Sequence, residues 1–173
     1  MKKLKTYIGL SNPKSPENVA SVMRAAGNYR VDSVFYTGER YLRALRLNPT
    51  MQNLSRKVGN NVLLSAVNQF SADSDDMKIV CVELVENALP LPDFQHPDSA
   101  YYIFGPEDGT ISQAVIDKAD AVVYVPTNGC MNLAATANVV LYDRLAKSGE
   151  RFSDRMFVLK NRDTNNNVRV RSK

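Results

Sequence analysis

The stretch Val122-Val-Tyr-Val-Pro-Thr-Asn-Gly-Cys-Met-Asn-Leu-Ala-Ala-Thr-Ala-Asn-Val-Val-Leu-Tyr142 decides how this chain folds. Its first four residues, 122–125, predict a buried strand that ends at Pro126. After a short polar connection, apolar side chains recur at spacings of three and four from about residue 130, which predicts a helix. The free backbone N–H groups at the start of such a helix can hold a cofactor. The alternative is an ordinary βα unit packed in a core.

Apolar runs elsewhere in the chain predict the remaining strands. These runs cover residues 5–10, 31–37, 62–66, 77–84 and 101–104. Helices are expected between the strands, at 16–26, 40–47 and 112–119. The first of them has Ser15 as N-cap, a proline at its first position and Gly27 at its end. Apolar strands that alternate with helices indicate an α/β fold, with a mainly parallel sheet covered by helices on both faces.

The bulk composition fits a globular protein of one domain. The chain has 173 residues, 44% of them apolar, and no apolar run approaches the roughly 20 residues that cross a bilayer. Met-Lys-Lys at the start is followed by no apolar segment, so we expect neither a secretory signal nor a membrane partner. Cys81 and Cys130 lie far apart and His96 is the single histidine, so no metal site is predicted. A reduced, cytoplasmic setting is expected.

The positive charge is concentrated in two segments. Residues 150–173 hold seven Lys or Arg against three acids and so carry the whole net charge of +4, which leaves 1–149 neutral. We therefore divide the chain into an α/β domain, 1–149, and a basic tail, 150–173. Within the domain, the segment 38–61 has one acid, Glu39, against the basic residues Arg40, Arg43, Arg46, Arg56 and Lys57. Two basic segments on a neutral body suggest a nucleic acid partner, although a basic tail can also have no partner.

Polar residues follow three of the predicted strands. Asn18 and Arg24 come after the first strand, 105–112 after the fifth, and 128–132 after the sixth. Because ligands collect beyond the carboxyl ends of parallel strands, these three segments can share one crevice. The chain has no Gly-x-Gly-x-x-Gly fingerprint and no Gly-Lys-Ser/Thr loop, which argues against a dinucleotide or nucleoside triphosphate site.

Taken in order, these segments resemble the SpoU/TrmH family of the SPOUT superfamily, which are S-adenosylmethionine-dependent RNA methyltransferases. The family's first motif, an asparagine with an arginine six residues later, is similar to Asn18 and Arg24. Its Phe-Gly-x-Glu turn is similar to 104–107. Its third motif, a proline and loop followed by Asn-Leu at a helix start, is similar to 126–133. The resemblance covers roughly residues 5–145, and the ordered set of motifs is specific.

The chain departs from the family pattern at two positions. Thr110 stands where glycine is usual, with Gly109 displaced by one residue, and Cys130 stands where a serine precedes Asn132. These departures keep open a first alternative, a knotted RNA-binding protein that has lost catalysis. A small-molecule α/β enzyme that uses an adenine nucleotide is the second alternative.

The resemblance implies that Asn18, Arg24, Glu107 and Asn132 form the catalytic set. A guanidinium does not give up its proton in proteins, so we expect Arg24 to clamp a phosphate and stabilise a developing alkoxide. Each residue also has a purely structural explanation. Arg24 could be a solvated helix arginine, Asn18 a helix-start residue, Glu107 a turn carboxylate and Asn132 a helix cap.

By the same resemblance the cofactor is S-adenosylmethionine. The residues expected to hold it are Leu84, Gly105, Val125, Asn128, Asn132 and Leu133. The family fold implies a C-terminal trefoil knot, in which the last helix is threaded through a loop. It also implies a homodimer, for which the helix at 131–145 is a candidate interface and an ordinary core helix the alternative.

The expected substrate is structured RNA, either tRNA or rRNA, and the expected reaction is methylation of a ribose 2′-hydroxyl. The residues expected to contact RNA phosphates are Arg24, Arg40, Arg43, Arg46, Arg56 and Lys57. Such contacts make the affinity for RNA fall steeply with salt.

Overall fold

The computed structural model describes residues 4–48, 50, 59, 61–150 and 155–171. Its strands are β1 (Thr6–Leu10), β2 (Ser33–Tyr36), β3 (Leu63–Ala66), β4 (Met77–Val82), β5 (Leu89–Pro90), β6 (Ser99–Phe104) and β7 (Ala121–Tyr124). Its helices are α1 (Pro16–Asn28), α2 (Arg40–Leu47), the 3-10 helix η1 (Leu91–Asp93), α4 (Gln113–Ile116), α5 (Leu133–Lys147) and α6 (Arg155–Asn161). All the predicted strands and helices are present, whereas β5, η1 and α6 were not predicted.

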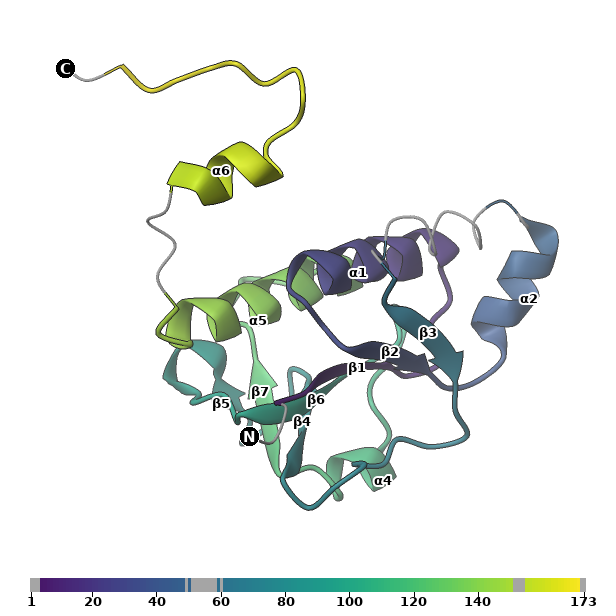
Figure 1. Ribbon diagram of the computed structural model, residues 1–173. Coiled ribbons are helices and arrows are strands. Elements are labelled where there is room, and N and C mark those ends of the chain that lie inside the picture. The colour runs from purple at the N-terminus through teal and green to yellow at the C-terminus, as the bar shows by residue number, and fades with distance from the viewer. Residues whose placement is uncertain (1–3, 49, 51–58, 60, 151–154, 172–173) are drawn as a thin grey trace.

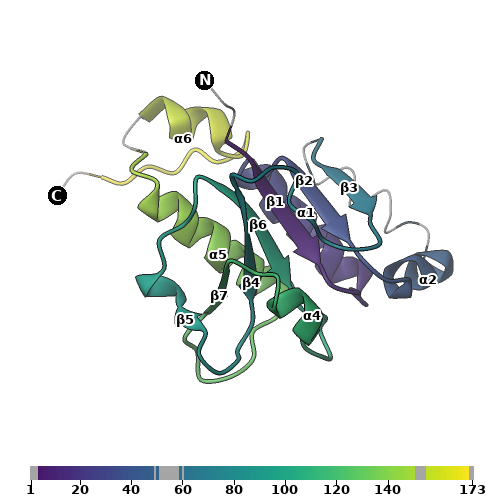
Figure 2. The same ribbon diagram turned by 90° about the horizontal axis from the view of Figure 1, so that it is seen from below.

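The strands form one sheet in the order β3-β2-β1-β6-β4-β7-β5, and every neighbouring pair is parallel. The prediction of a mainly parallel α/β sheet is therefore confirmed. Helices α1 and α5 lie side by side on one face of this sheet, and the short helix α4 lies on the other (Figure 1). The view from below looks onto the sheet and shows its strands side by side, from β5 to β3 (Figure 2). The second face is thus covered by α4 and by connecting loops rather than by long helices.

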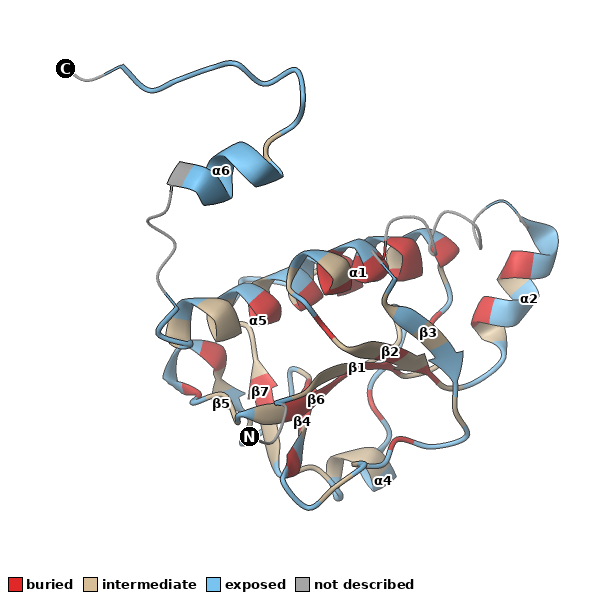
Figure 3. Cartoon of the chain, in the orientation of Figure 1, coloured by how far each residue is buried: buried red, intermediate tan, exposed pale blue. Residues whose placement is uncertain are grey.

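The central strands bury side chains on both of their faces. In β6, Ala100, Tyr102 and Phe104 belong to the core beneath α1 and α5, whereas Tyr101 and Ile103 belong to a second core on the opposite face. This alternation follows from the period of two along a strand. Buried residues of α1 and α5 lie against the sheet, while α6 is exposed from Met156 to Asn161 (Figure 3). Burial on both faces explains why these strands are continuous apolar runs in the sequence.

Helix α1 begins as predicted and ends differently. The Ser15 hydroxyl accepts a hydrogen bond from the backbone N–H of Asn18 at 3.1 Å, so Ser15 is the N-cap. The expectation that Gly27 closes the helix is wrong, because α1 continues to Asn28. Arg30, with φ of 57°, takes the left-handed conformation that usually falls to glycine.

The decisive helix, α5, starts later than the spacing of apolar residues predicted. Residues 130 and 131 belong to the preceding loop, and α5 begins at Leu133 with Asn132 as its N-cap. The Asn132 side-chain oxygen accepts the backbone N–H groups of Ala134 and Ala135 at 2.9 and 3.2 Å. Those two groups have no carbonyl partner within the helix, so the cap fixes where the helix begins.

Candidate active site

The strand order brings four loops to one edge of the sheet. Strands β1, β6, β4 and β7 are consecutive neighbours, and all run in the same direction. The chain leaves β1 toward β2 on one side, whereas β6 flanks β1 on the other, so the strand order reverses at β1. Crevices at such a reversal are where open α/β sheets bind ligands. The selected residues Leu84, Gly105, Glu107, Val125, Asn128 and Asn132 lie in the loops after β4, β6 and β7, and α1, which follows β1, carries Asn18 and Arg24.

Glu107, in the loop after β6, fastens that loop to the start of α1. One carboxylate oxygen accepts the backbone N–H of Lys14 at 2.9 Å, and the other accepts the N–H of Ser15 at 2.9 Å and the Asn18 side-chain amide at 3.2 Å. Burial tends to raise the pKa of Glu107, but the N–H of Ser15 and the other donors outweigh it, so the pKa lies below its usual value. Glu107 is therefore an anion that holds two loops together.

Asn18 and Asn132 extend this arrangement to the start of α5. The side-chain oxygen of Asn18 accepts the side-chain amide of Asn132 at 2.8 Å. Since the Asn132 oxygen caps α5, only its NH2 group can face Asn18. The Asn18 amide has one satisfactory orientation for the same reason, with its NH2 group toward the Glu107 carboxylate. The three residues, 89 and 114 positions apart along the chain, thus form one hydrogen-bonded chain, called here the Asn–Glu–Asn network.

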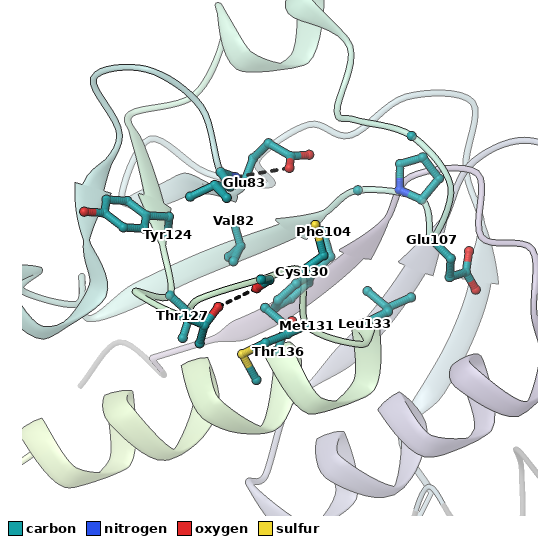
Figure 4. Close-up of a pocket in the computed structure, with 16 residues that line it drawn as sticks. Val82, Glu83, Phe104, Glu107, Tyr124, Thr127, Cys130, Met131, Leu133 and Thr136 are labelled. Atoms are coloured by element: carbon teal, nitrogen blue, oxygen red, sulfur yellow. Dashed lines mark hydrogen bonds between the residues drawn. The ribbon is translucent and has the colours of Figure 1, made fainter.

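A pocket with a volume of about 180 Å³ lies beside this network. Four of the six residues expected to hold the cofactor line it: Leu84, Gly105, Val125 and Leu133. The other two, Asn128 and Asn132, are not among the lining residues, although their neighbours Thr127, Gly129 and Met131 are. In Figure 4, Tyr124 and Glu107 lie on opposite sides of the pocket, with Cys130 and Met131 between them.

The sequence analysis missed Glu83, which also lines the pocket. One of its oxygens accepts the backbone N–H of Ile111 at 2.9 Å, and the other accepts that of Leu84 at 3.1 Å. A Cβ atom at Gly105 would stand 2.8 Å from the Glu83 carboxylate, so a side chain there would displace that carboxylate. The signal in the sequence was an acid at the end of an apolar strand, but the predicted strand 77–84 included Glu83.

Arg24 is not part of the Asn–Glu–Asn network. It lies on the exposed face of α1, six residues or about 9 Å along the helix axis beyond Asn18, and does not line the pocket. In the part of the chain that the structure describes, no hydrogen bond or ion pair of its side chain is present. Its guanidinium is therefore available to a ligand.

The basic residues of α2 are partly engaged in ion pairs. Arg40 contacts Asp108 at 2.7 Å, and Arg43 contacts Glu39 at 2.7 Å. Arg46 is exposed in the last turn of the helix. The other two predicted RNA contacts, Arg56 and Lys57, lie outside the described residues.

The described residues contain neither a cluster of metal ligands nor a helix that could span a membrane. No group of three or more His, Cys, Asp or Glu side chains there could hold a metal ion. No described helix combines the length and apolar character that crossing a membrane requires.

A parallel sheet with a pocket beyond the carboxyl ends of β4, β6 and β7 places the chain in the class of α/β proteins that bind ligands at that edge of the sheet. The sequence matches the profile of the SpoU rRNA Methylase family over residues 5–142. The chain belongs to that family, and the family predicted from the three motifs is confirmed.

Solved structures share the fold. The SpoU methyltransferase AviRb from Streptomyces viridochromogenes, in complex with AdoMet, has 17% identity and a TM-score of 0.68 over 86% of this chain and 59% of its own. The A. aeolicus TrmH/SpoU tRNA modifying enzyme has 13% identity and a TM-score of 0.67, over 84% of this chain and 76% of that enzyme's chain. A structure described for 2-OH methylation of C/U34 on tRNA has 17% identity and a TM-score of 0.69, over 86% of this chain and 93% of that chain. Among curated proteins, none matches this sequence at a significant level.

Proposed function

We propose that this protein is an S-adenosylmethionine-dependent RNA methyltransferase that methylates a ribose 2′-hydroxyl of tRNA or rRNA. Membership of the SpoU rRNA Methylase family supports the reaction class. The observation that carries the proposal furthest is the Asn–Glu–Asn network, which joins three separate family motifs beside one pocket. The 2-OH methylation of tRNA described for a similar structure supports the ribose as acceptor.

The pocket residues suit the cofactor. Val82, Phe104 and Leu133 supply apolar walls, while Gly105 and Gly129 leave backbone groups accessible. Cofactor pockets are mostly apolar, with a few placed polar groups. The Glu83 carboxylate already accepts two N–H groups, but its remaining lone pairs can accept a further hydroxyl. When bound, S-adenosylmethionine supplies the electrophilic methyl group.

Arg24 positions the acceptor in this proposal. Its guanidinium holds a phosphate next to the target nucleotide and stabilises the alkoxide that develops on the ribose oxygen. A guanidinium keeps its own proton, so the hydroxyl proton passes to solvent. Asn18, Glu107 and Asn132 position the loops around the pocket and do not themselves need to touch RNA.

The departures from the family pattern do not obstruct the pocket. Thr110 is exposed and does not line it, whereas Gly109 does. Cys130 lines the pocket from an exposed position and differs from serine only in having sulfur in place of the hydroxyl oxygen. We therefore favour the active enzyme over an RNA-binding protein without catalysis. The family match argues against the small-molecule enzyme.

We extend the proposal to four further properties. The C-terminal trefoil knot and a homodimer with α5 at its interface rest on the family resemblance. The cytoplasmic location rests on the cysteine usage, and the division into a domain at 1–149 and a basic tail at 150–173 rests on the distribution of charge. The exposed side chain of Tyr142 on α5, with 62% of its surface accessible, supports an interface there.

Calorimetry with S-adenosylhomocysteine and a methyl-transfer assay together test the proposal. We expect binding at about micromolar concentration, and an Arg24→Ala variant that binds equally well within a few fold but transfers no methyl group. Loss of binding in this variant would contradict the role given to Arg24. Failure of the unchanged protein to bind would favour the RNA-binding alternative, and preference for an adenine nucleotide the small-molecule enzyme.

A further inference from the structure

A small group of opposite charges lies beside the pocket, on three loops that follow neighbouring strands. Lys14 belongs to the loop after β1, Arg40 to the start of α2 after β2, and Asp108 to the loop after β6. The Asp108 carboxylate is 2.7 Å from the Arg40 guanidinium and 3.5 Å from the Lys14 ammonium. This group is called here the Lys–Arg–Asp cluster. All three side chains reach solvent.

The loops that carry the two cations of the cluster pack against each other through their backbones. The backbone N–H of Lys14 donates to Glu107, which belongs to the Asn–Glu–Asn network. The loop of Lys14 also packs against the loop before α2, where Gly38 has a φ of 74° and leaves no room for a side chain next to Asn12. The two loops that carry Lys14 and Arg40 are therefore adjacent, which allows both side chains to reach the same carboxylate.

Asp108 is the acidic member of this cluster, between two basic side chains. Arg40 lowers the pKa of the Asp108 carboxyl, with Lys14 contributing less, so Asp108 is an anion at neutral pH. Its carboxylate stands at the point that a phosphate oxygen between two cations would occupy. It follows Glu107 directly in the chain and lies in the loop that carries the pocket residues Gly105 and Gly109.

We propose that Lys14 and Arg40 form a binding site for one phosphate of the substrate RNA, and that Asp108 occupies this site until RNA displaces it. An RNA phosphate competes well for Arg40, because a guanidinium binds a phosphate through two parallel hydrogen bonds. The inference rests on the proposed function only in taking RNA as the substrate.

Binding of labelled, unfractionated tRNA at 50 mM salt tests the inference, because phosphate contacts are largely independent of sequence. Asp108→Asn removes the competing charge and should tighten tRNA binding by about three- to fivefold. Asp75→Asn is the matched control, since Asp75 is exposed and precedes β4 at the opposite edge of the sheet. It changes net charge equally and should alter the affinity by less than about twofold.

Arg40→Ala is the second variant to be tested in the same binding measurement. It should weaken tRNA binding, reduce the slope of log affinity against log salt by about one, and cancel the gain when combined with Asp108→Asn. If Asp108 only braces its loop, Asp108→Asn weakens binding of both tRNA and S-adenosylhomocysteine, which would overturn the inference. Equal effects of Asp108→Asn and Asp75→Asn would overturn it too.

The inference can fail without the proposed function. If the unchanged protein transfers methyl groups to RNA but Asp108→Asn binds tRNA no better than the control, only the Lys–Arg–Asp site is wrong. If the unchanged protein neither binds nor methylates RNA, both the site and the proposed function are wrong.

Discussion

Asn132 has two separable tasks, and substitutions can remove them one at a time. Its oxygen caps α5, and its amide donates to Asn18 at 2.8 Å. Asn132→Ala removes both interactions. Asn132→Ser keeps a hydroxyl that can cap the helix but cannot reach Asn18. Asn132→Asp keeps the cap and replaces the amide that donates to Asn18 with a carboxylate oxygen.

The expected losses of stability follow from these contacts. Loss of a helix cap costs about 1 kcal/mol. The hydrogen bond to Asn18 contributes about 0.5 kcal/mol, at the low end of the usual range because Asn132 is exposed. We expect Asn132→Ala to lower the free energy of unfolding by about 1.5 kcal/mol and Tm by about 3–6 °C. Asn132→Ser should cost about 0.5 kcal/mol.

Asn132→Asp separates the network from the cap most sharply. Asn18 would then lie between two carboxylates, the new one and that of Glu107, and its amide can offer its NH2 group to only one. The helix keeps its cap, yet the link between the loops is broken. We expect near-normal helicity with weaker binding of S-adenosylhomocysteine, by about tenfold or more.

Urea unfolding and calorimetry on the three variants provide the measurements. If Asn132→Ser is as unstable as Asn132→Ala, the cap contributes nothing and the reasoning fails. If Asn132→Asp binds S-adenosylhomocysteine as tightly as the unchanged protein, the Asn–Glu–Asn network does not shape the pocket.

Two further predictions concern the pocket and a buried histidine. Gly105→Ala should weaken S-adenosylhomocysteine binding by about tenfold or more, since the added methyl group meets the Glu83 carboxylate; unchanged affinity in calorimetry would contradict this. His96 lies between Tyr102 and Asp143, and burial lowers its pKa although Asp143 opposes the shift. As pH falls below about 6.5, His96 therefore takes up a proton in the unfolded chain before it does so in the folded protein. The free energy of unfolding should decrease between that pH and the lower pKa of the folded protein, by at most about 1.4 kcal/mol per pH unit. Urea unfolding at pH 7.5 and 5.5 measures this decrease. Because His96 is the only histidine in the sequence, an equal decrease in the His96→Gln variant would refute the prediction.

Most of the fold was predictable because its signals are local. The helix at 40–47 was predicted with its observed bounds, since Asn48 and the following proline end its apolar spacing. The two-residue strand β5 gave no such signal, because it is defined by pairing with β7 rather than by its own composition. Helix α6 is similarly short, and its exposed apolar residues give no core-facing pattern.

The sequence identified several residues of the candidate site but did not predict the hydrogen bonds between them. Asn18, Glu107 and Asn132 were identified from motifs, yet their mutual hydrogen bonds depend on the strand order β1-β6-β4-β7, which no local pattern encodes. The pairing of Arg40 with Asp108 spans 68 positions and was missed for the same reason. Arg40 was therefore predicted as a free RNA contact, whereas the structure shows it already holding a carboxylate.

The central claim is that the pocket and Arg24 together transfer a methyl group to RNA. Incubation with S-adenosylmethionine labelled in its methyl group and with RNA from cells lacking the protein tests this directly, with mass spectrometry of the resulting nucleosides. The account predicts one labelled nucleoside with the methyl group on its ribose oxygen, and none when Arg24→Ala is used. Unlabelled RNA, or label on a base alone, would contradict it.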